Sequence, residues 1–220
     1  MLYVHAKKNI QACFVALILF CPQSLIAASI GLQADTLIVN QGEALSVDVY
    51  VTGIGQADAP TLGAYDFNLF YDPLLFGLSS VSFSSALGDD YFFEALLGVD
   101  EPALGNLNTY GISLLEESAS TCIFCIDPYL EDIQSDSMVL ATFVFNALLD
   151  GIGGFDLVSL AMSDGVGYEL FDTNLLDNEI SVFVQPYSVP EPSSLLLLFG
   201  GLTAVLSLPF FRKNRGFGRK

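Results

Sequence analysis

Basic side chains are missing from the whole middle of this 220-residue chain. All seven Lys and Arg residues lie close to the two ends, and the single histidine is His5. All 25 acidic residues lie between Asp35 and Glu191, so their stretch of chain cannot form an ion pair between its own side chains. A surface that carries only negative side chains repels nucleic acid and anionic lipid, because it offers nothing to neutralise phosphate. The composition therefore excludes nucleic acid as a partner and favours basic surfaces or divalent cations.

The same absence removes most catalytic arrangements. Between Ser29 and Phe211 there is no histidine or lysine, so Ser-His, Cys-His and Ser-Lys nucleophile pairs are unavailable. The chain also lacks a GxSxG elbow, a phosphate-binding loop and a dinucleotide fingerprint. A carboxylate pair could hydrolyse a glycoside, but nothing singles out two of the 25 acidic residues. We expect no catalytic residues and no enzyme; a secreted hydrolase stays as a distant alternative.

Cysteine is scarce, and only Cys122 and Cys125 lie beyond the first 28 residues. One CxxC pair supplies two metal ligands, whereas structural zinc needs four, and no histidine is present to complete the set. The pair stands in "TCIFCID", between acidic residues and before Pro128, which indicates a loop. In an exported protein we expect a local disulfide between the two, with free thiols as the alternative.

Calcium is the one cofactor that the acidic residues leave open. The segment "DTNLLDNE", residues 172–179, has Leu176 and Asp177 where an EF-hand loop needs a ligand and a glycine. The acidic turns at 88–90 and 164–165 offer oxygens, but ordinary solvation of surface carboxylates is the preferred interpretation of both. We predict no metal site and no cofactor.

Tryptophan is absent, which weakens the case for a carbohydrate-binding platform. Strand alternation places Tyr50 on an outward face and turns Tyr65 and Tyr71 inward. A single outward ring is not a platform, although carbohydrate binding remains an alternative function.

The N-terminus reads as a signal peptide covering residues 1–28. Lys7 and Lys8 precede the apolar stretch within residues 10–28, and Ala27 and Ala28 suit signal-peptidase cleavage. A permanent N-terminal anchor is the alternative. Lipidation at Cys21 is disfavoured, because proline follows it and no small residues precede it.

A second apolar segment, residues 193–211, has 19 residues and no charge. As a helix it would span about 28 Å, close to the thickness of a bilayer core. The basic tail at 212–220 includes Arg212, Lys213 and Arg215, and by the positive-inside rule it stays in the cytoplasm. The segment is therefore predicted to be a transmembrane helix with the acidic body on the far side of the membrane.

The residues before this helix are Val189, Pro190, Glu191 and Pro192. Together with the apolar helix and the basic tail, they resemble the bacterial PEP-CTERM sorting signal, here residues 188–220. The resemblance implies that an exosortase, a membrane-embedded processing enzyme, recognises the tail and cuts near the Pro-Glu-Pro motif. An ordinary single-pass anchor with a proline-containing stalk is the alternative.

Residues 29–187 are dominated by a period of two. In "ALSVDVYVT" the apolar residues Leu45, Val47, Val49 and Val51 alternate with polar ones, which is typical of a strand with one buried face. Similar strands are expected at 64–71, 138–147, 155–162 and 180–185. In the strand at 138–147, the residues expected on the buried face are Val139, Ala141, Phe143 and Phe145. Turn residues separate them, at 40–42, 53–60, 71–73, 150–154 and 163–167. The pattern predicts an all-β, two-sheet sandwich, with one short helix near 89–97.

Three stretches, at 39–53, 62–83 and 140–167, resemble the cohesin-like domains often found ahead of PEP-CTERM tails. The most useful marker is Tyr71-Asp72-Pro73, which follows an alternating strand. The resemblance implies a nine-stranded jelly-roll sandwich, related to cellulosomal cohesins and to some carbohydrate-binding modules. No dockerin-recognition residue can be transferred to this sequence.

These expectations combine into one hypothesis. The chain is an exported, non-catalytic protein that is held at the membrane by its C-terminal helix and then delivered by an exosortase to the cell surface or the extracellular matrix. Its expected role is structural or adhesive, with extracellular polysaccharide or another surface protein as partner. The alternatives are a carbohydrate-binding module and a protein–protein adaptor of cohesin type.

Overall fold

The computed structural model describes residues 28–56, 59–170, 174–175 and 178–187. The predicted sorting signal at 188–220 lies outside these residues, and so does the predicted signal peptide up to residue 27. Within the described ranges, no helix is long and apolar enough to cross a bilayer.

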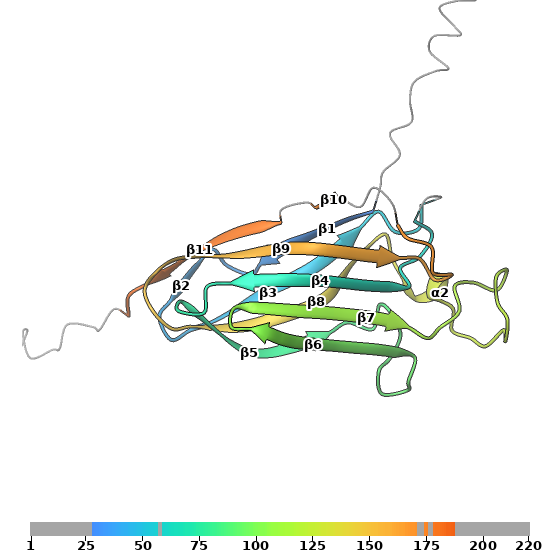
Figure 1. Cartoon of the computed structure of the whole chain (residues 1–220), viewed down its shortest axis with the longest axis horizontal. Helices are drawn as coiled ribbons and strands as arrows, with labels where there is room; N and C mark the ends of the chain where they lie inside the picture. The colour runs from blue at the N-terminus through green and yellow to red at the C-terminus, as the bar shows by residue number, and fades with distance from the viewer. Residues whose placement is uncertain (1–27, 57–58, 171–173, 176–177, 188–220) are drawn as a thin grey trace, which may run out of the picture. The chain divides into compact units, whose positions relative to one another are not determined.

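The described residues form two β-sheets packed face to face, as the sequence predicts (Figure 1). One sheet has five strands in the order β10-β1-β3-β8-β5, and the other has six in the order β2-β11-β9-β4-β7-β6. The strands are β1 (Ser29–Ala34), β2 (Ile38–Asn40), β3 (Ala44–Thr52), β4 (Ala64–Tyr71), β5 (Phe76–Phe83), β6 (Ala95–Ala103), β7 (Asn106–Ser113), β8 (Ser137–Ala147), β9 (Gly151–Ser163), β10 (Asn174–Leu175) and β11 (Glu179–Gln185).

Nine of these strands have six residues or more, and the remaining two, β2 and β10, have three and two. Both short strands pair in parallel, β2 with β11 and β10 with β1, and each lies at the edge of its sheet. The described sandwich therefore has eleven strands, nine longer and two short, where the sequence resemblance implies nine.

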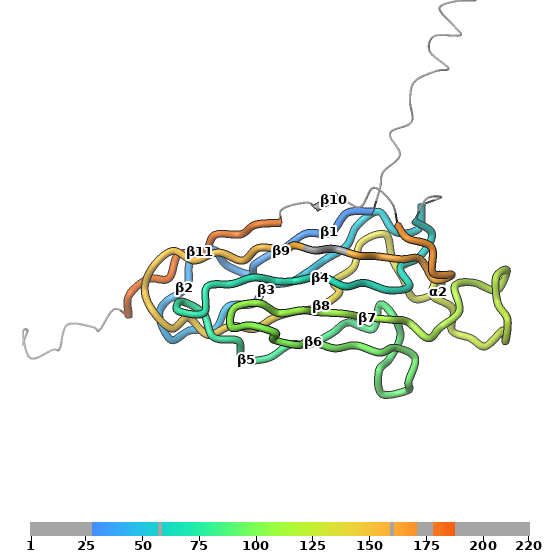
Figure 2. Tube along the Cα trace, viewed as in Figure 1, coloured from blue at the N-terminus to red at the C-terminus, as the bar shows by residue number. Residues whose placement is uncertain are grey.

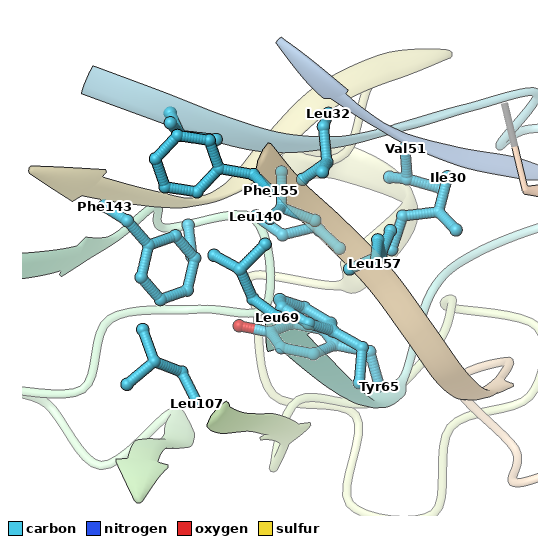
Figure 3. Packing of buried hydrophobic residues seen from close by; sticks show 14 of the residues in the cluster. Ile30, Leu32, Val51, Tyr65, Leu69, Leu107, Leu140, Phe143, Phe155 and Leu157 are labelled. Atoms are coloured by element: carbon cyan, nitrogen blue, oxygen red, sulfur yellow. The ribbon is translucent and has the colours of Figure 1, made fainter. Parts of the chain in front are cut away.

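The alternating residues of the sequence face the interior between the sheets. Leu45, Val47, Val49 and Val51 of β3 are all fully buried. Side chains from both sheets meet there, for example Leu140 and Phe143 from β8 with Leu69 and Phe155 from β4 and β9 (Figure 3). Burial of this apolar area is the main force that holds the two sheets together.

The expected buried face of β8 is wrong at one position. The pairing of β3 with β8 shifts between Val49 and Tyr50, so that Val49 faces Ala141 while Tyr50 faces Val139. Leu140 is the extra residue of this bulge and is 1% exposed, whereas Val139 is 37% exposed. A bulge changes which side chains face inward, and strict alternation cannot anticipate it.

The expected helix near 89–97 is also wrong. The Asp89 side chain accepts a hydrogen bond from the N–H of Tyr91, and Phe93 adopts a positive φ of 60°. These features close turns rather than a helix, and β6 begins at Ala95. The one short helix of the described chain, α2 (Leu130–Ile133), lies instead in the connection between β7 and β8.

The turn expected at 150–154 is shorter than predicted, because β9 already begins at Gly151. A Cβ built on Gly153 would lie 2.6 Å from the Phe76 ring. Glycine is needed there for close packing between the sheets, not for chain reversal.

Strand register defines two opposite ends of the sandwich (Figure 2). At one end β11 runs out beside the start of β9, with Val184 opposite Gly151. We call this the C-terminal end. At the other end β9 finishes opposite the start of β4, with Ser163 facing Ala64. We call this the loop end, because the long connection 114–136 and the turns at 84–94 and 164–169 lie there.

Candidate functional site

A groove of about 510 Å³ lies on the outer face of the six-stranded sheet, near the loop end. Its outward-facing lining comes from three adjacent strands and from the turn after β9. The lining includes Ala64, Asp66, Tyr110, Ile112, Ala161 and Glu169.

Small side chains make the floor of the groove. On β4, Asp66 faces Tyr110 of β7 on one side and Ala161 of β9 on the other. Ala64 lies two residues earlier on the same face of β4, so two alanines flank the aspartate. Where neighbouring strands place larger side chains, a depression is left above the alanines.

One wall is apolar and is formed by β7. Ile112 is exposed, and Tyr110 is half-buried beside it on the same face. The Tyr110 ring extends over Gly98 of β6, since a Cβ built on Gly98 would lie 2.4 Å from its Cζ atom. Glycine at this position lets the aromatic ring lie flat against the sheet.

The opposite wall comes from the turn that follows β9. The Asp164 carboxylate accepts hydrogen bonds from the N–H groups of Val166, at 3.1 Å, and Tyr168, at 2.7 Å. Gly167 adopts a positive φ of 90°, which a side chain would strain. The turn brings Glu169 back to pair with Ser163, so Glu169 also lines the groove.

The charge of the groove is entirely negative. Asp66 and Glu169 are its charged side chains, and Asp66 accepts a 2.8 Å hydrogen bond from the side-chain amide of Asn108. No basic side chain occurs anywhere between Ser29 and Phe211, so the described chain cannot neutralise either carboxylate.

Two inward-facing tyrosines lie in the same sheet. Tyr65, next to the groove floor, is buried, and its hydroxyl has no hydrogen-bond partner. Burial raises the pKa of that hydroxyl well above its usual range. Tyr71, at the other end of β4, donates a 3.0 Å hydrogen bond to Glu101, and burial together with this carboxylate raises its pKa to about 12. The predicted inward orientation of both rings is confirmed, while Tyr50 is half-buried.

The cysteine pair lies far out in the connection between β7 and β8. Cys122 and Cys125 are joined by a disulfide with an S–S distance of 2.04 Å. Between and after them, Ile123, Phe124 and Ile126 are exposed.

The Glu116 carboxylate accepts hydrogen bonds from the backbone N–H groups of Ile123, Phe124 and Cys125. These bonds lower its pKa. A single side chain therefore holds the disulfide-closed turn in place.

The acidic turns that could have bound calcium use their carboxylates internally. Asp89 and Asp164 each accept hydrogen bonds from backbone N–H groups of their own turns. Among the residues that the structure describes, no group of three or more His, Cys, Asp or Glu side chains is placed to hold a metal ion.

The other residues singled out from the sequence lie beyond the described part of the chain. These are the motif Val189, Pro190, Glu191 and Pro192, and the basic residues Arg212, Lys213 and Arg215. The groove itself was not anticipated. The only hint in the sequence is the outward position of Asp66 on an alternating strand. Its partners in the groove, Tyr110 and Glu169, are 44 and 103 residues further along the chain, so the sequence does not bring them together.

No protein-family model matches this sequence, and no curated protein matches it. The fold, in contrast, is similar to solved cohesin structures. The cohesin module of a family 33 glycoside hydrolase from Clostridium perfringens aligns with a TM-score of 0.54 at 12% identity, covering 73% of this chain and 98% of that one. A type II cohesin from Acetivibrio cellulolyticus gives a TM-score of 0.55 at 13% identity, covering 71% and 95%.

A third similar structure is the sixth cohesin of scaffoldin B from Acetivibrio cellulolyticus, solved in complex with a Cel5 dockerin. It aligns with a TM-score of 0.52 at 17% identity and covers 71% of this chain and 99% of that one. The described domain therefore has a cohesin-like fold, and at these identities the likeness concerns the fold alone.

Proposed function

We propose that this chain is an exported, non-catalytic binding module that holds a partner protein against the outer face of its six-stranded sheet. The observation that carries the proposal is the groove, a concave and amphipathic site on the outer face of this sheet. A depression in an exposed sheet face is suited to receive a side chain of a second protein. The fold supports the same function, since a similar cohesin was solved with a bound dockerin.

Adaptor binding is better supported than a purely structural role. A filler of extracellular matrix needs no built site, whereas here Asp164, Gly167 and Gly98 shape the walls of a groove. Catalysis is not part of the proposal, because the groove contains two carboxylates and no histidine, lysine or cysteine.

The proposed place of action is outside the cytoplasm. The charge pattern of the two ends favours export by a signal peptide, retention by residues 193–211 and processing near Glu191 by an exosortase-type enzyme. Mass spectrometry of the mature C-terminus, from membranes and from culture medium, tests this route. A product that ends near Glu191 is expected, and a chain that retains Lys220 in both fractions would contradict processing.

Partner binding is tested by filling the groove. In Ala161→Trp an exposed β9 residue of the groove is replaced by a bulky side chain that strands accommodate well. Asn146→Trp is the matched control, because Asn146 is exposed on the outer face of the other sheet. Proteins retained by the wild type and by Asn146→Trp, but lost with Ala161→Trp, are purified and titrated against all three.

We expect a purified partner to bind the wild type and the control equally and Ala161→Trp at least about tenfold more weakly, since a filled site excludes the contact. Equal binding by all three proteins would show that the groove is not the contact surface. The absence of any specifically retained protein would contradict the adaptor function itself.

A further inference from the structure

The groove combines two features that few side chains match at once. Its β7 wall offers the apolar surface of Ile112 and the ring of Tyr110. Its floor and its opposite wall offer the carboxylates of Asp66 and Glu169. An occupant that complements the groove therefore has an apolar stem and a positively charged head.

Anionic occupants are excluded by charge. A phosphate or a carboxylate would meet Asp66 and Glu169 without a cation to offset them, because the domain has none. A bare divalent cation would also be bound weakly, since two carboxylates from separate elements supply fewer oxygen ligands than calcium requires. An uncharged side chain would leave both carboxylates without an ionic partner.

Lysine and arginine side chains fit this description. Each carries three or four methylene groups that lie along apolar surface while the charged end reaches a carboxylate. The face of an aromatic ring such as Tyr110 attracts the same cations. Arginine can in addition donate paired hydrogen bonds to one carboxylate.

We propose that the partner protein inserts a lysine or arginine side chain into this groove, with its stem against Ile112 and Tyr110 and its charged end between Asp66 and Glu169. This inference rests on the proposed function and names the chemistry of the contact. The opposite charges of the two surfaces also steer their encounter, so binding weakens as salt is added.

The test uses blocked pentapeptides of sequence Gly-Ser-X-Ser-Gly, where X is lysine, arginine or glutamine. Each is titrated into the isotopically labelled protein, and amide NMR shifts are followed. We expect the lysine and arginine peptides to shift a saturable set of residues around Ala161, Gly167 and Glu169. The glutamine peptide is expected to leave these amides unchanged.

Two double variants separate the groove from the general negative charge. Asp66→Asn with Glu169→Gln removes two charges from the groove, and Asp136→Asn with Asp150→Asn removes two exposed charges elsewhere. The groove variant is expected to weaken the peptide about fivefold or more and the control less than about twofold. Equal weakening by both variants, shifts scattered over the surface, or equal binding of the glutamine peptide would overturn the inference.

The outcome is distinguishable from failure of the adaptor function. If a partner is lost on Ala161→Trp but the basic peptides do not bind the groove, the groove remains the contact surface and its preference for lysine or arginine is wrong. If no partner protein loses binding on Ala161→Trp, the proposed function is contradicted, whatever the peptides do.

Discussion

Two residues of β4, Tyr65 and Tyr71, show how similar buried side chains differ in what their hydroxyls contribute. The Tyr71 hydroxyl donates to the Glu101 carboxylate, whereas the Tyr65 hydroxyl has no partner. A hydrogen bond to a charged group stabilises the folded state. A buried hydroxyl without a partner destabilises it, because its hydrogen bonds to water are lost on folding and are not replaced. Removing the two hydroxyls should therefore have different effects.

We predict that Tyr71→Phe lowers the free energy of unfolding by about 1–2 kcal/mol at neutral pH and that Tyr65→Phe leaves it unchanged or raises it slightly. Urea unfolding of the two variants and the wild type checks the prediction. Equal destabilisation by both substitutions would mean that Tyr65 has a hydrogen-bond partner in solution.

The same hydroxyl of Tyr71 predicts how stability depends on alkaline pH. Its pKa is raised from 10.0 to about 12 in the folded protein, so the folded state holds the proton more tightly than the unfolded chain. The stabilisation is complete below pH 10 and is lost as the pH rises towards 12. Tyr71→Phe should lose less stability over this interval than the wild type does; an identical pH profile would contradict the assignment.

At the scale of elements, the sequence predicted five of the eleven strands of the described chain, namely β3, β4, β8, β9 and β11. It missed the long strands β1, β5, β6 and β7, and it did not predict the irregularities. The strands at 44–52 and 64–71 match β3 and β4 residue by residue, because each has an unbroken alternation between turn residues. The bulge at Leu140 escaped prediction, since an extra residue in one strand depends on the register with its neighbour. The groove escaped for a related reason: Asp66, Tyr110 and Glu169 become neighbours only through pairing between distant strands.

The bulge at Leu140 predicts which of two neighbouring side chains of β8 contributes more to stability. Leu140→Ala should lower the free energy of unfolding by about 2–4 kcal/mol, because it leaves a cavity between the sheets. Val139→Ala should cost less than about 1 kcal/mol, since that side chain is partly in water. Chemical unfolding of both variants distinguishes the bulged register from simple alternation, which would give the larger loss at Val139.

The turn around the cysteine pair is a second element with a measurable consequence. Intact mass with and without reductant should show that the oxidised protein lacks two hydrogens.

The hydrogen bonds of Glu116 in this turn are tested separately. The Glu116→Gln variant should show faster amide hydrogen exchange at residues 123–125 than the wild type, because the amide side chain is a weaker acceptor than the carboxylate. Asp132→Asn, a carboxylate outside this cluster of bonds, is the control. Free thiols in the untreated protein, or unchanged exchange in Glu116→Gln, would contradict this description of the turn.

At the scale of the whole molecule, the domain folds with charges of one sign only. With no basic side chain between Ser29 and Phe211, its 24 carboxylates up to Glu179 repel one another, and none is offset by an ion pair with another side chain of the domain. The sandwich is stable because the apolar core outweighs this repulsion, not because electrostatic attraction adds to it. Uncompensated charge of this kind also makes the surface selective for basic partners.

We therefore predict that added sodium chloride stabilises the domain, since the Debye length falls to about 3 Å at 1 M and repulsion is screened. The midpoint of thermal unfolding should rise with salt, and Asp136→Asn with Asp150→Asn should rise less steeply because fewer charges remain. A midpoint that falls with salt would indicate stabilising electrostatic attraction that the sequence cannot provide.

Site-specific photo-crosslinking in intact cells of the source organism tests the central claim most directly. A photoreactive amino acid is placed at Ala161, in the groove, or at Asn146, on the opposite sheet, and crosslinked products are identified by mass spectrometry. The account predicts a discrete crosslinked protein from position 161, located outside the cytoplasm and joined near a lysine or arginine, with no such product from position 146. The same products from both positions, or a crosslinked partner only in the cytoplasm, would contradict it.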